Sequence, residues 1–239
     1  MLKLAISGCL GRMGNRITQL ALHDTDFQVT TLLEHAENPQ LGKIVEGITI
    51  TSDPAALDGC DVLIEFTSPG ATLEHLQACR QHHVKAVIGT TGLSADQIQT
   101  IQEASGEIPI VYSSNMSIGV NILFQLARQL AQSGPSSYRV TMREAHHVHK
   151  KDAPSGTAKT LKKIIEDNSS HKVPEIEAVR EDEIVGDHKI VFESDEDTLT
   201  LDHHAKSRDI FVKGALVAAK FLAGKDKGLF TMQDVLGLK

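Results

Sequence analysis

The segment EAHHVHKKDAPSGTA, residues 144–158, concentrates side chains that can do chemistry. Three histidines and two lysines lie within six residues of it, and a Pro-Ser-Gly-Thr sequence follows. A histidine can donate a proton near neutral pH, and a lysine supplies a positive charge with hydrogen-bond donors. Ser155 can cap a helix whose first amides, at Gly156 and Thr157, suit a carboxylate. The segment therefore predicts proton donation to a small, multiply anionic substrate.

Two other interpretations of this segment stay open. His146, His147 and His149 could bind a metal ion, but adjacent histidines on an extended chain point apart, and no HExxH motif, cysteine or carboxylate cluster completes a ligand set. The same residues could also form a solvated basic loop. In a chain with a net charge of −7, however, an island of positive charge at 146–151 suits a dicarboxylate. We therefore expect a substrate site and no metal.

A second motif, GCLGRMG at residues 8–14, follows a predicted strand and opens a predicted helix. Glycines there allow a tight turn and the close approach of a pyrophosphate to helix amides. The pattern departs from GxGxxG because Cys9 occupies the first glycine position. Glu34 lies 20 residues beyond Gly14, where an acid can accept hydrogen bonds from an adenosine ribose. Together they indicate a dinucleotide site, although a glycine turn can also be purely structural.

Two polar segments, GTTG at 89–92 and SSNMS at 113–117, each end a predicted strand. Ligands of open α/β sheets bind at the carboxyl edge of the strands, and Thr, Ser and Asn offer hydrogen bonds there. Each segment taken separately could equally be an ordinary loop.

The first half of the chain alternates between strand and helix patterns, which predicts a doubly wound parallel sheet. The predicted strands are 2–7, 27–34, 61–66, 85–90 and 108–113, and the predicted helices are 12–22, 71–82 and 94–104. These elements place the glycine turn, GTTG and SSNMS at one edge of the sheet.

The pattern changes after Asn115. A helix over 117–131, a strand over 138–147 and an amphipathic helix over 156–166 precede three alternating runs, EIEAVRED, HKIVFES and DTLTLDHHA, which suggest antiparallel strands. A long helix over 208–224 follows. We predict a Rossmann-like dinucleotide-binding domain of residues 1–115 and 208–239. An inserted α+β domain of residues 116–207, with a mostly antiparallel sheet, would bind substrate and oligomerise. The site would be a cleft that closes, with hinges near 115–117 and 205–208.

Composition excludes several classes of function. The 239 residues are 41% hydrophobic, yet no apolar run approaches the roughly 18–20 residues that span a bilayer. The first strand is broken too soon by Gly8 to form a signal peptide. The net charge of −7 argues against a nucleic-acid binder. Three cysteines without CxxC spacing indicate a reducing compartment, so we expect a cytoplasmic protein.

The motifs together resemble the dihydrodipicolinate reductase family, also called 4-hydroxy-tetrahydrodipicolinate reductase, of bacterial diaminopimelate and lysine biosynthesis. The resemblance runs the whole length of the chain. It is carried by GCLGRMG (8–14), EFT (65–67), GTTG (89–92), SNMSIGVN (114–121), EAHHVHKKDAPSGTA (144–158) and GLFTMQDVLGL (228–238).

The resemblance implies a role for each matching position. His146 matches the proton donor and Lys150 its catalytic partner, while His147, Gly156 and Thr157 match substrate-binding positions. The positions that match the nicotinamide cofactor site are Gly8, Cys9, Leu10, Gly11, Arg12, Met13, Glu34, Gly89, Thr90, Thr91, Ser113, Ser114, Asn115 and Met116. Members transfer a hydride from NADH or NADPH to a cyclic, unsaturated dicarboxylate, with loss of water, and their C-terminal sheet builds a homotetramer.

Two departures from the family pattern bear on the cofactor. Many relatives have Arg directly after the acidic ribose-binding residue, where this chain has His35. Cys9 replaces a small residue and could tighten the phosphate turn.

Two alternative functions also stay open: another NAD(P)-dependent dehydrogenase of a small carboxylate, and a non-catalytic NAD(H) sensor. The first leaves the histidine-lysine cluster unexplained, and the second predicts a DNA-binding module that is not evident.

Overall fold

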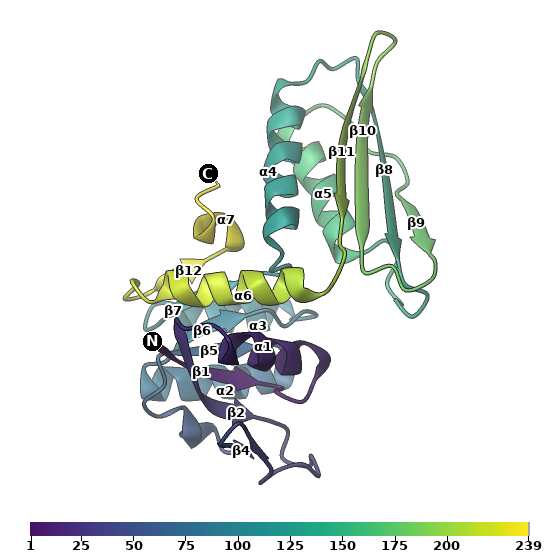
Figure 1. Ribbon diagram of the computed structural model, residues 1–239. Helices are drawn as coiled ribbons and strands as arrows, with labels where there is room; N and C mark the ends of the chain where they lie inside the picture. Colours follow the sequence, from purple (N-terminus) through teal and green to yellow (C-terminus); the bar gives the residue numbers. More distant parts are fainter. Residues whose placement is uncertain (239) are drawn as a thin grey trace. The chain divides into compact units, whose positions relative to one another are not determined.

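The computed structural model describes residues 1–238 and divides the chain into two compact units (Figure 1). Unit 1 combines Met1–Met116 with Phe211–Gly237, and unit 2 contains Ser117–Ile210. Unit 1 is therefore discontinuous in sequence, because the chain leaves it after one long segment and returns to it near the end. No helix among residues 1–238 is long and apolar enough to cross a membrane.

Unit 1 contains the predicted doubly wound sheet, whose strand order is β12-β7-β6-β5-β1-β2-β4-β3. Every pairing is parallel except that of β3 with β4. The strands are β1 (Leu2–Ser7), β2 (Phe27–Leu33), β3 (Ile44–Val45), β4 (Ile48–Thr51), β5 (Val62–Glu65), β6 (Lys85–Ile88), β7 (Pro109–Tyr112) and β12 (Gly228–Phe230). The helical segments are α1 (Arg12–Leu22), η1 (Pro54–Leu57), α2 (Pro69–His82), α3 (Ala95–Ala104), α6 (Asp209–Leu222) and α7 (Met232–Val235).

Alternation along the strands builds a core on each face of this sheet. Leu4 and Ile6 pack with buried side chains of α1 and α6, whereas Ala5 of the same strand packs with α2 and α3. The chain proceeds from β1 outward to β2, then crosses back to β5 on the other side of β1. The loops after β1 and β5 therefore diverge at the carboxyl edge, which is where ligands bind in such sheets.

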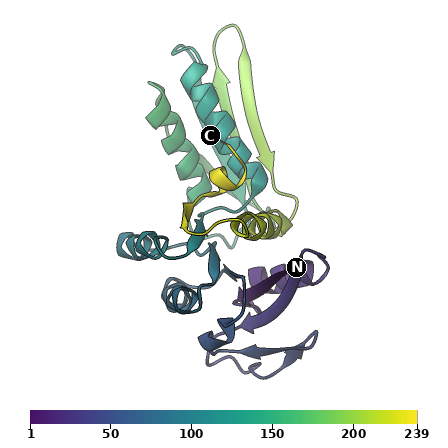
Figure 2. The same cartoon turned by 90° about the vertical axis from the view of Figure 1, so that its left-hand side faces the viewer.

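Unit 2 contains a four-stranded sheet of order β11-β10-β8-β9, with α4 and α5 packed on one face (Figures 1 and 2). Its elements are α4 (Ile118–Ser133), β8 (Arg139–His146), α5 (Gly156–Asn168), β9 (Glu177–Arg180), β10 (Asp187–Glu193) and β11 (Thr198–His204). Val140, Met142, Ile190 and Phe192 face the helices and are buried. Arg139, Thr141 and Arg143, which alternate with them on β8, are exposed.

The structure corrects one expectation in unit 2 and adds elements to unit 1. The predicted run around Glu177–Arg180 pairs with β8 in parallel, not antiparallel, because α5 carries the chain back between the two strands. The β3–β4 hairpin has no counterpart among the predicted elements. Glu46 and Gly47 turn it with positive φ angles of 48° and 81°, in the manner of a tight hairpin turn.

Candidate active site

His146 stands at the end of β8 on its buried face, two residues after Glu144. Alternation along the strand puts both side chains on the side that carries Val140 and Met142 deeper in the core. The Nδ1 atom of His146 is hydrogen-bonded to the Glu144 carboxylate. A buried carboxylate behind an imidazole fixes the orientation of the ring and the nitrogen that carries its proton.

The Glu144 carboxylate also receives donors from two other elements. The two terminal nitrogens of Arg180 on β9 each bond a different carboxylate oxygen, at 3.1 and 2.9 Å. The backbone N–H of Ser155, at the start of α5, donates to Oε1 at 3.1 Å. Burial alone would raise the pKa of Glu144, but these bonds outweigh it and hold the pKa below its ordinary value. Burial lowers the pKa of His146, and Glu144 offsets part of that effect.

Lys150 lies in the loop after β8 with its ammonium group 2.7 Å from the carboxylate of Asp152. Arg180 also donates to the backbone carbonyls of Lys150 and Asp152, so the loop is tied to the same guanidinium that clamps Glu144. Burial would raise the pKa of Asp152, but the bond from Lys150 lowers it overall. An anionic substrate at Lys150 would compete with this carboxylate.

The helix start predicted at Ser155 is present. The Ser155 hydroxyl accepts the Ala158 N–H at 3.2 Å and so caps α5. Gly156 is exposed, and a Cβ placed on it would have open space around it. The first turn of α5 can therefore be reached by a ligand beside the His146 and Lys150 cluster.

The rings of His147 and His149 lie near each other, with centroids 6.1 Å apart. The buried Nδ1 atom of His147 has no hydrogen-bond partner among the described residues. Burial lowers the pKa of His147. His149 is exposed, 3.4 Å from Glu183. Within residues 1–238 no group of three or more His, Cys, Asp or Glu side chains is arranged to hold a metal ion.

Two further histidines extend this cluster: His188 lies against His146, and His203 lies near His188. The His188 ring packs edge-on against His146 with centroids 5.3 Å apart, and its Nε2 lies 3.3 Å from the Ser155 hydroxyl. The His203 ring is 6.4 Å from that of His188. Burial, followed by the neighbouring His146, lowers the pKa of His188 to about 4. The alternation of β10 predicts an inward residue at 188, but not its neighbours.

In unit 1 the glycine turn has the geometry that a pyrophosphate needs. Gly8 has a φ of +60°, and the Gly11 N–H donates to the Gly8 carbonyl at 2.9 Å. A Cβ at Gly14 would lie 2.0 Å from the Gly8 carbonyl oxygen. Only glycine at position 14 therefore allows α1 to begin this close to the turn.

Glu34 follows β2 and faces this turn. Its Oε2 accepts the Leu10 N–H at 3.0 Å, and its Oε1 accepts the His35 N–H at 2.9 Å. A pocket of about 390 Å³ opens beside it, lined by Gly8, Gly11, Glu34, His35, Ala36, Ser52, Pro54, Phe66, Thr67, Ser68, Ala71, Glu74 and His75. A glycine turn, a carboxylate and an enclosing pocket fit the pyrophosphate and ribose of a nicotinamide dinucleotide.

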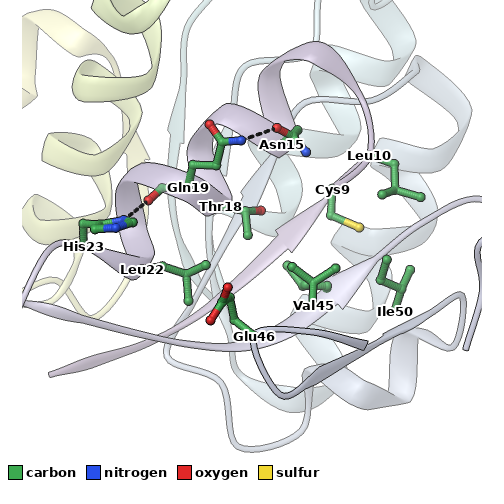
Figure 3. A pocket seen from close by; sticks show the side chains of 11 residues that line it. Cys9, Leu10, Asn15, Thr18, Gln19, Leu22, His23, Val45, Glu46 and Ile50 are labelled. Carbon is green, nitrogen blue, oxygen red and sulfur yellow. Dashed lines mark hydrogen bonds between the residues drawn. The ribbon is translucent and has the colours of Figure 1, made fainter. Parts of the chain in front are cut away.

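Cys9 belongs to a different cavity, of about 410 Å³, between α1 and the β3–β4 hairpin (Figure 3). Its side chain is buried and lines this cavity with Leu10, Val45 and Ile50 (Figure 3). Burial raises the pKa of the Cys9 thiol to about 11, so it stays protonated and unreactive. The side chain at position 9 thus faces away from the Glu34 pocket.

The remaining predicted cofactor residues are more dispersed. Arg12 is exposed on the first turn of α1, and Met13 and Met116 pack in the core. Thr90 is buried, and its hydroxyl accepts the Thr67 N–H at 3.1 Å. The others, Gly89, Thr91, Ser113, Ser114 and Asn115, follow β6 and β7 at the carboxyl edge and do not line the Glu34 pocket.

Glu65, at the end of β5, is a buried carboxylate that the sequence analysis gave no role. It accepts bonds from Ser7 at 2.5 Å and His75 at 2.7 Å, and from the hydroxyls of Thr67 and Thr72. The ends of β1 and β5 and the first turns of α2 are thereby joined beneath the Glu34 pocket. Three of these partners are short polar side chains at ordinary strand, loop and helix positions, so sequence alone gave no signal.

Comparison with known proteins identifies the family. The family models described as "Dihydrodipicolinate reductase, N-terminus" and "Dihydrodipicolinate reductase, C-terminus" match residues 2–116 and 119–236. The chain is 41% identical to a 4-hydroxy-tetrahydrodipicolinate reductase of Nitrosomonas eutropha, across 100% of this chain and 99% of the relative. It is 39% identical to one of Syntrophotalea carbinolica, across 100% of both.

A solved structure shares the fold. A dihydrodipicolinate reductase from Paenisporosarcina sp. TG-14 superposes with a TM-score of 0.85 at 24% identity, over 98% of each chain. The Rossmann-like sheet with a second, mostly antiparallel sheet is thus confirmed. The chain belongs to the dihydrodipicolinate reductase family and is an oxidoreductase that uses NADH or NADPH.

Proposed function

We propose that this chain reduces 4-hydroxy-tetrahydrodipicolinate to tetrahydrodipicolinate in diaminopimelate and lysine biosynthesis, with His146 as proton donor and Lys150 as its partner. Family membership supports the reaction. The observation that supports the residue roles is the cluster in which His146, the Lys150 loop and the start of α5 are all bonded to Glu144 or Arg180.

Each unit supplies one half of this chemistry. In unit 1, the glycine turn and Glu34 would hold the pyrophosphate and ribose of NADH or NADPH, which supplies the hydride. In unit 2, the amides of Gly156 and Thr157 bind one substrate carboxylate at the positive end of α5. Lys150 adds a positive charge, and His146 gives a proton. One hydride and one proton enter the substrate, and one water molecule leaves.

The pKa of His146 matters to this role. Because burial lowers the pKa of His146, its imidazole is mostly neutral at neutral pH in the free protein. A dianionic substrate nearby favours the charged ring. Substrate binding therefore favours protonation of His146, which is the form that can donate a proton. The rate should fall as pH rises, and the fall in kcat should occur at higher pH than the fall in kcat/KM.

The reaction is tested by NADH consumption when the chain is coupled to a dihydrodipicolinate synthase reaction. We expect oxidation of NADH only when the synthase and both of its substrates are present. Consumption with amino-acid semialdehydes instead would favour the other dehydrogenase. NADH binding by calorimetry without any turnover would favour the sensor.

A dicarboxylate that resembles the substrate gives a direct probe of the site. The solved relative from Paenisporosarcina sp. TG-14 has dipicolinate bound. We expect dipicolinate, a planar ring with two carboxylates, to inhibit this chain by competing for Lys150 and the Gly156–Thr157 amides. Calorimetry that showed no dipicolinate binding would contradict this placement.

We also propose a homotetramer assembled through unit 2. Its four-stranded sheet has helices on one face, while Arg139, Thr141 and Arg143 on the other face are exposed. A small sheet covered on one face is marginal alone, and closed symmetry lets copies cover one another. Light scattering at micromolar concentration should give four times the chain mass, and a single-chain mass would refute assembly.

The cysteines support a cytoplasmic location for this enzyme. Cys9, Cys60 and Cys79 are buried and unpaired. Unpaired thiols are typical of a reducing compartment. Recovery of the enzyme with periplasmic markers on cell fractionation would contradict this location.

A further inference from the structure

One buried carboxylate is shared between the proposed acid and the proposed anion site. Oε2 of Glu144 bonds Nδ1 of His146 and one Arg180 nitrogen, while Oε1 takes the Ser155 N–H and the other Arg180 nitrogen. These are four donors on a group with about four lone-pair positions, so the carboxylate is saturated. Ser155 directly precedes the Gly156 and Thr157 amides.

We propose that Glu144, clamped by Arg180, is a positioning residue for the reaction. It keeps the proton of neutral His146 on Nδ1, so that Nε2 delivers the proton to substrate. It also fixes the placement of His146 relative to the carboxylate-binding turn at the start of α5. This inference rests on the proposed role of His146 as proton donor.

The surroundings of Nε2 agree with this assignment. A Cβ built on Gly186 would lie 2.9 Å from the Nε2 atom of His146, closer than real Cβ contacts. Glycine at 186, just before β10, therefore leaves Nε2 unblocked on that side. The two ring nitrogens have different neighbours: a saturated carboxylate at Nδ1 and a position without a side chain at Nε2.

Arg180 also holds the loop after β8 that carries Lys150. Its planar fork matches both carboxylate oxygens, which a lysine could not do. Its remaining donors reach the carbonyls of Lys150, Asp152 and Val179. The acid, the lysine loop and the helix start are therefore held by one ion pair whose two side chains are 17% and 0% exposed.

The charges around His146 give this proposal a readout in pH. Burial, Lys150 in the loop and Arg180 on β9 disfavour the protonated ring, whereas Glu144 on β8 favours it. His188 on β10 packs edge-on against the same ring. Removing the negative charge of Glu144 leaves only influences that lower the pKa of His146. The descending limb of the pH–rate profile should then move to lower pH.

The test is a pH profile of kcat and kcat/KM for Glu144→Gln, which keeps the shape of the side chain and removes its charge. We expect kcat to fall about 10- to 100-fold, the range for losing a group that orients another, and the limb to move to lower pH. NADH affinity should be unchanged. Glu177→Gln is the matched control, because Glu177 pairs with Arg143 on the same sheet but on its exposed face.

A second variant covers the case in which Glu144→Gln folds poorly. Gly186→Ala keeps the charge of Glu144 and places a methyl group against Nε2. We expect kcat to fall without a shift of the pH limb. In the wild type, ¹⁵N NMR of the histidine rings should report neutral His146 with its proton on Nδ1.

The outcomes distinguish a failure of the positioning role of Glu144 from a failure of the proton-donor role of His146. A proton on Nε2 in the neutral ring, or a Glu144→Gln profile that superimposes on the wild type, would overturn the positioning role. If His146→Gln itself kept the wild-type rate, the proposed proton donor would be wrong instead.

Discussion

The two units use a carboxylate in opposite ways. Glu144 in unit 2 is fully buried, and four donors from His146, Arg180 and Ser155 saturate it. Glu34 in unit 1 is half-buried and accepts only two backbone N–H groups in the described structure. A carboxylate has about four lone-pair positions, so Glu34 retains acceptors for a ligand and Glu144 does not.

This difference shows where each side of the reaction is specified. The substrate side is built from charged side chains bonded to one another, so changes there should alter the chemistry and its pH dependence. The cofactor side is built from backbone amides and from glycines such as Gly8 and Gly14, where a side chain would collide. Changes beside Glu34 should therefore alter which ligand binds, and leave the chemistry intact.

The largest effect is expected where the charged cluster acts on the substrate. His146→Gln and Lys150→Ala should each lower kcat by about 10²–10⁴-fold, the usual contribution of a general acid or base. NADH affinity should be retained in both. The control is His149→Gln, since His149 is exposed nearby. Steady-state rates within a few-fold of wild type for both variants would show that the cluster is not the chemical centre.

Burial of the histidine cluster should also make stability depend on pH. The folded pKa of His188 is about 4, against an ordinary value of 6.5. Below pH 6.5 His188 is protonated in the unfolded chain but stays neutral in the folded chain until about pH 4. Its contribution to the free energy of unfolding is therefore complete above pH 6.5 and is lost as pH falls toward 4. The loss should be about 3 kcal/mol.

The measurement is the free energy of unfolding in urea across that pH range, in wild type and in His188→Gln. The variant should lose less stability than the wild type as the solution is acidified. Parallel curves for the two proteins would mean that His188 already carries its proton in the folded state.

A moderate effect is expected at the helix start. Thr157→Val removes a hydroxyl that we expect to face a substrate carboxylate. KM should rise and dipicolinate should bind about tenfold more weakly, as for a lost hydrogen bond to a charged group. NADH affinity should stay nearly unchanged, because the altered group lies in unit 2. Unchanged dipicolinate affinity in the calorimeter would place the carboxylate elsewhere.

The smallest effect concerns the choice of cofactor. His35 lines the Glu34 pocket, and its Nδ1 accepts the Glu37 N–H at 3.3 Å. An imidazole lacks the permanent charge and planar fork of a guanidinium, so His35 offers less to the 2′-phosphate of NADPH, which would also stand near the Glu34 carboxylate. We expect both cofactors to serve, with NADH favoured.

His35→Arg tests this directly, because a guanidinium stays charged and its fork suits phosphate. The variant should raise kcat/KM for NADPH about two- to fivefold, the modest gain of an exposed ion pair. Arg12, exposed on α1, would blunt the effect if it already contacts the phosphate. A strong NADPH preference in the wild type would contradict this prediction.

Much of the fold could be predicted from periodicity, and the exceptions have physical causes. The strands β1, β2, β5, β6 and β7 are short apolar runs between helix patterns, and their alternation alone places Leu4 and Ala5 in different cores. Alternation does not encode the direction of pairing, so β9 was assigned antiparallel. The β3–β4 hairpin has strands of two and four residues, too short for a periodic signal.

The candidate site divides in the same way. His146, Lys150 and Ser155 lie within one segment, so their spacing carried information. Arg180 is 36 residues from Glu144, and only the pairing of β8 with β9 brings them together. The direction of the Cys9 side chain could not be predicted from the sequence either. It depends on the turn at Gly8 and on how α1 packs against the β3–β4 hairpin.

The return of the chain to unit 1 has a consequence for its synthesis. Val212, Ala215 and Leu216 of α6 cover the face of the parallel sheet that carries Leu4 and Ile6. They are translated after the whole of unit 2. The strands that are made first, β1 and β2, therefore stay uncovered on this face for the longest time. The core of unit 2 lies within the continuous segment Ser117–Ile210 and can form first. A nascent chain that stalls before α6 leaves an apolar sheet face exposed to aggregation.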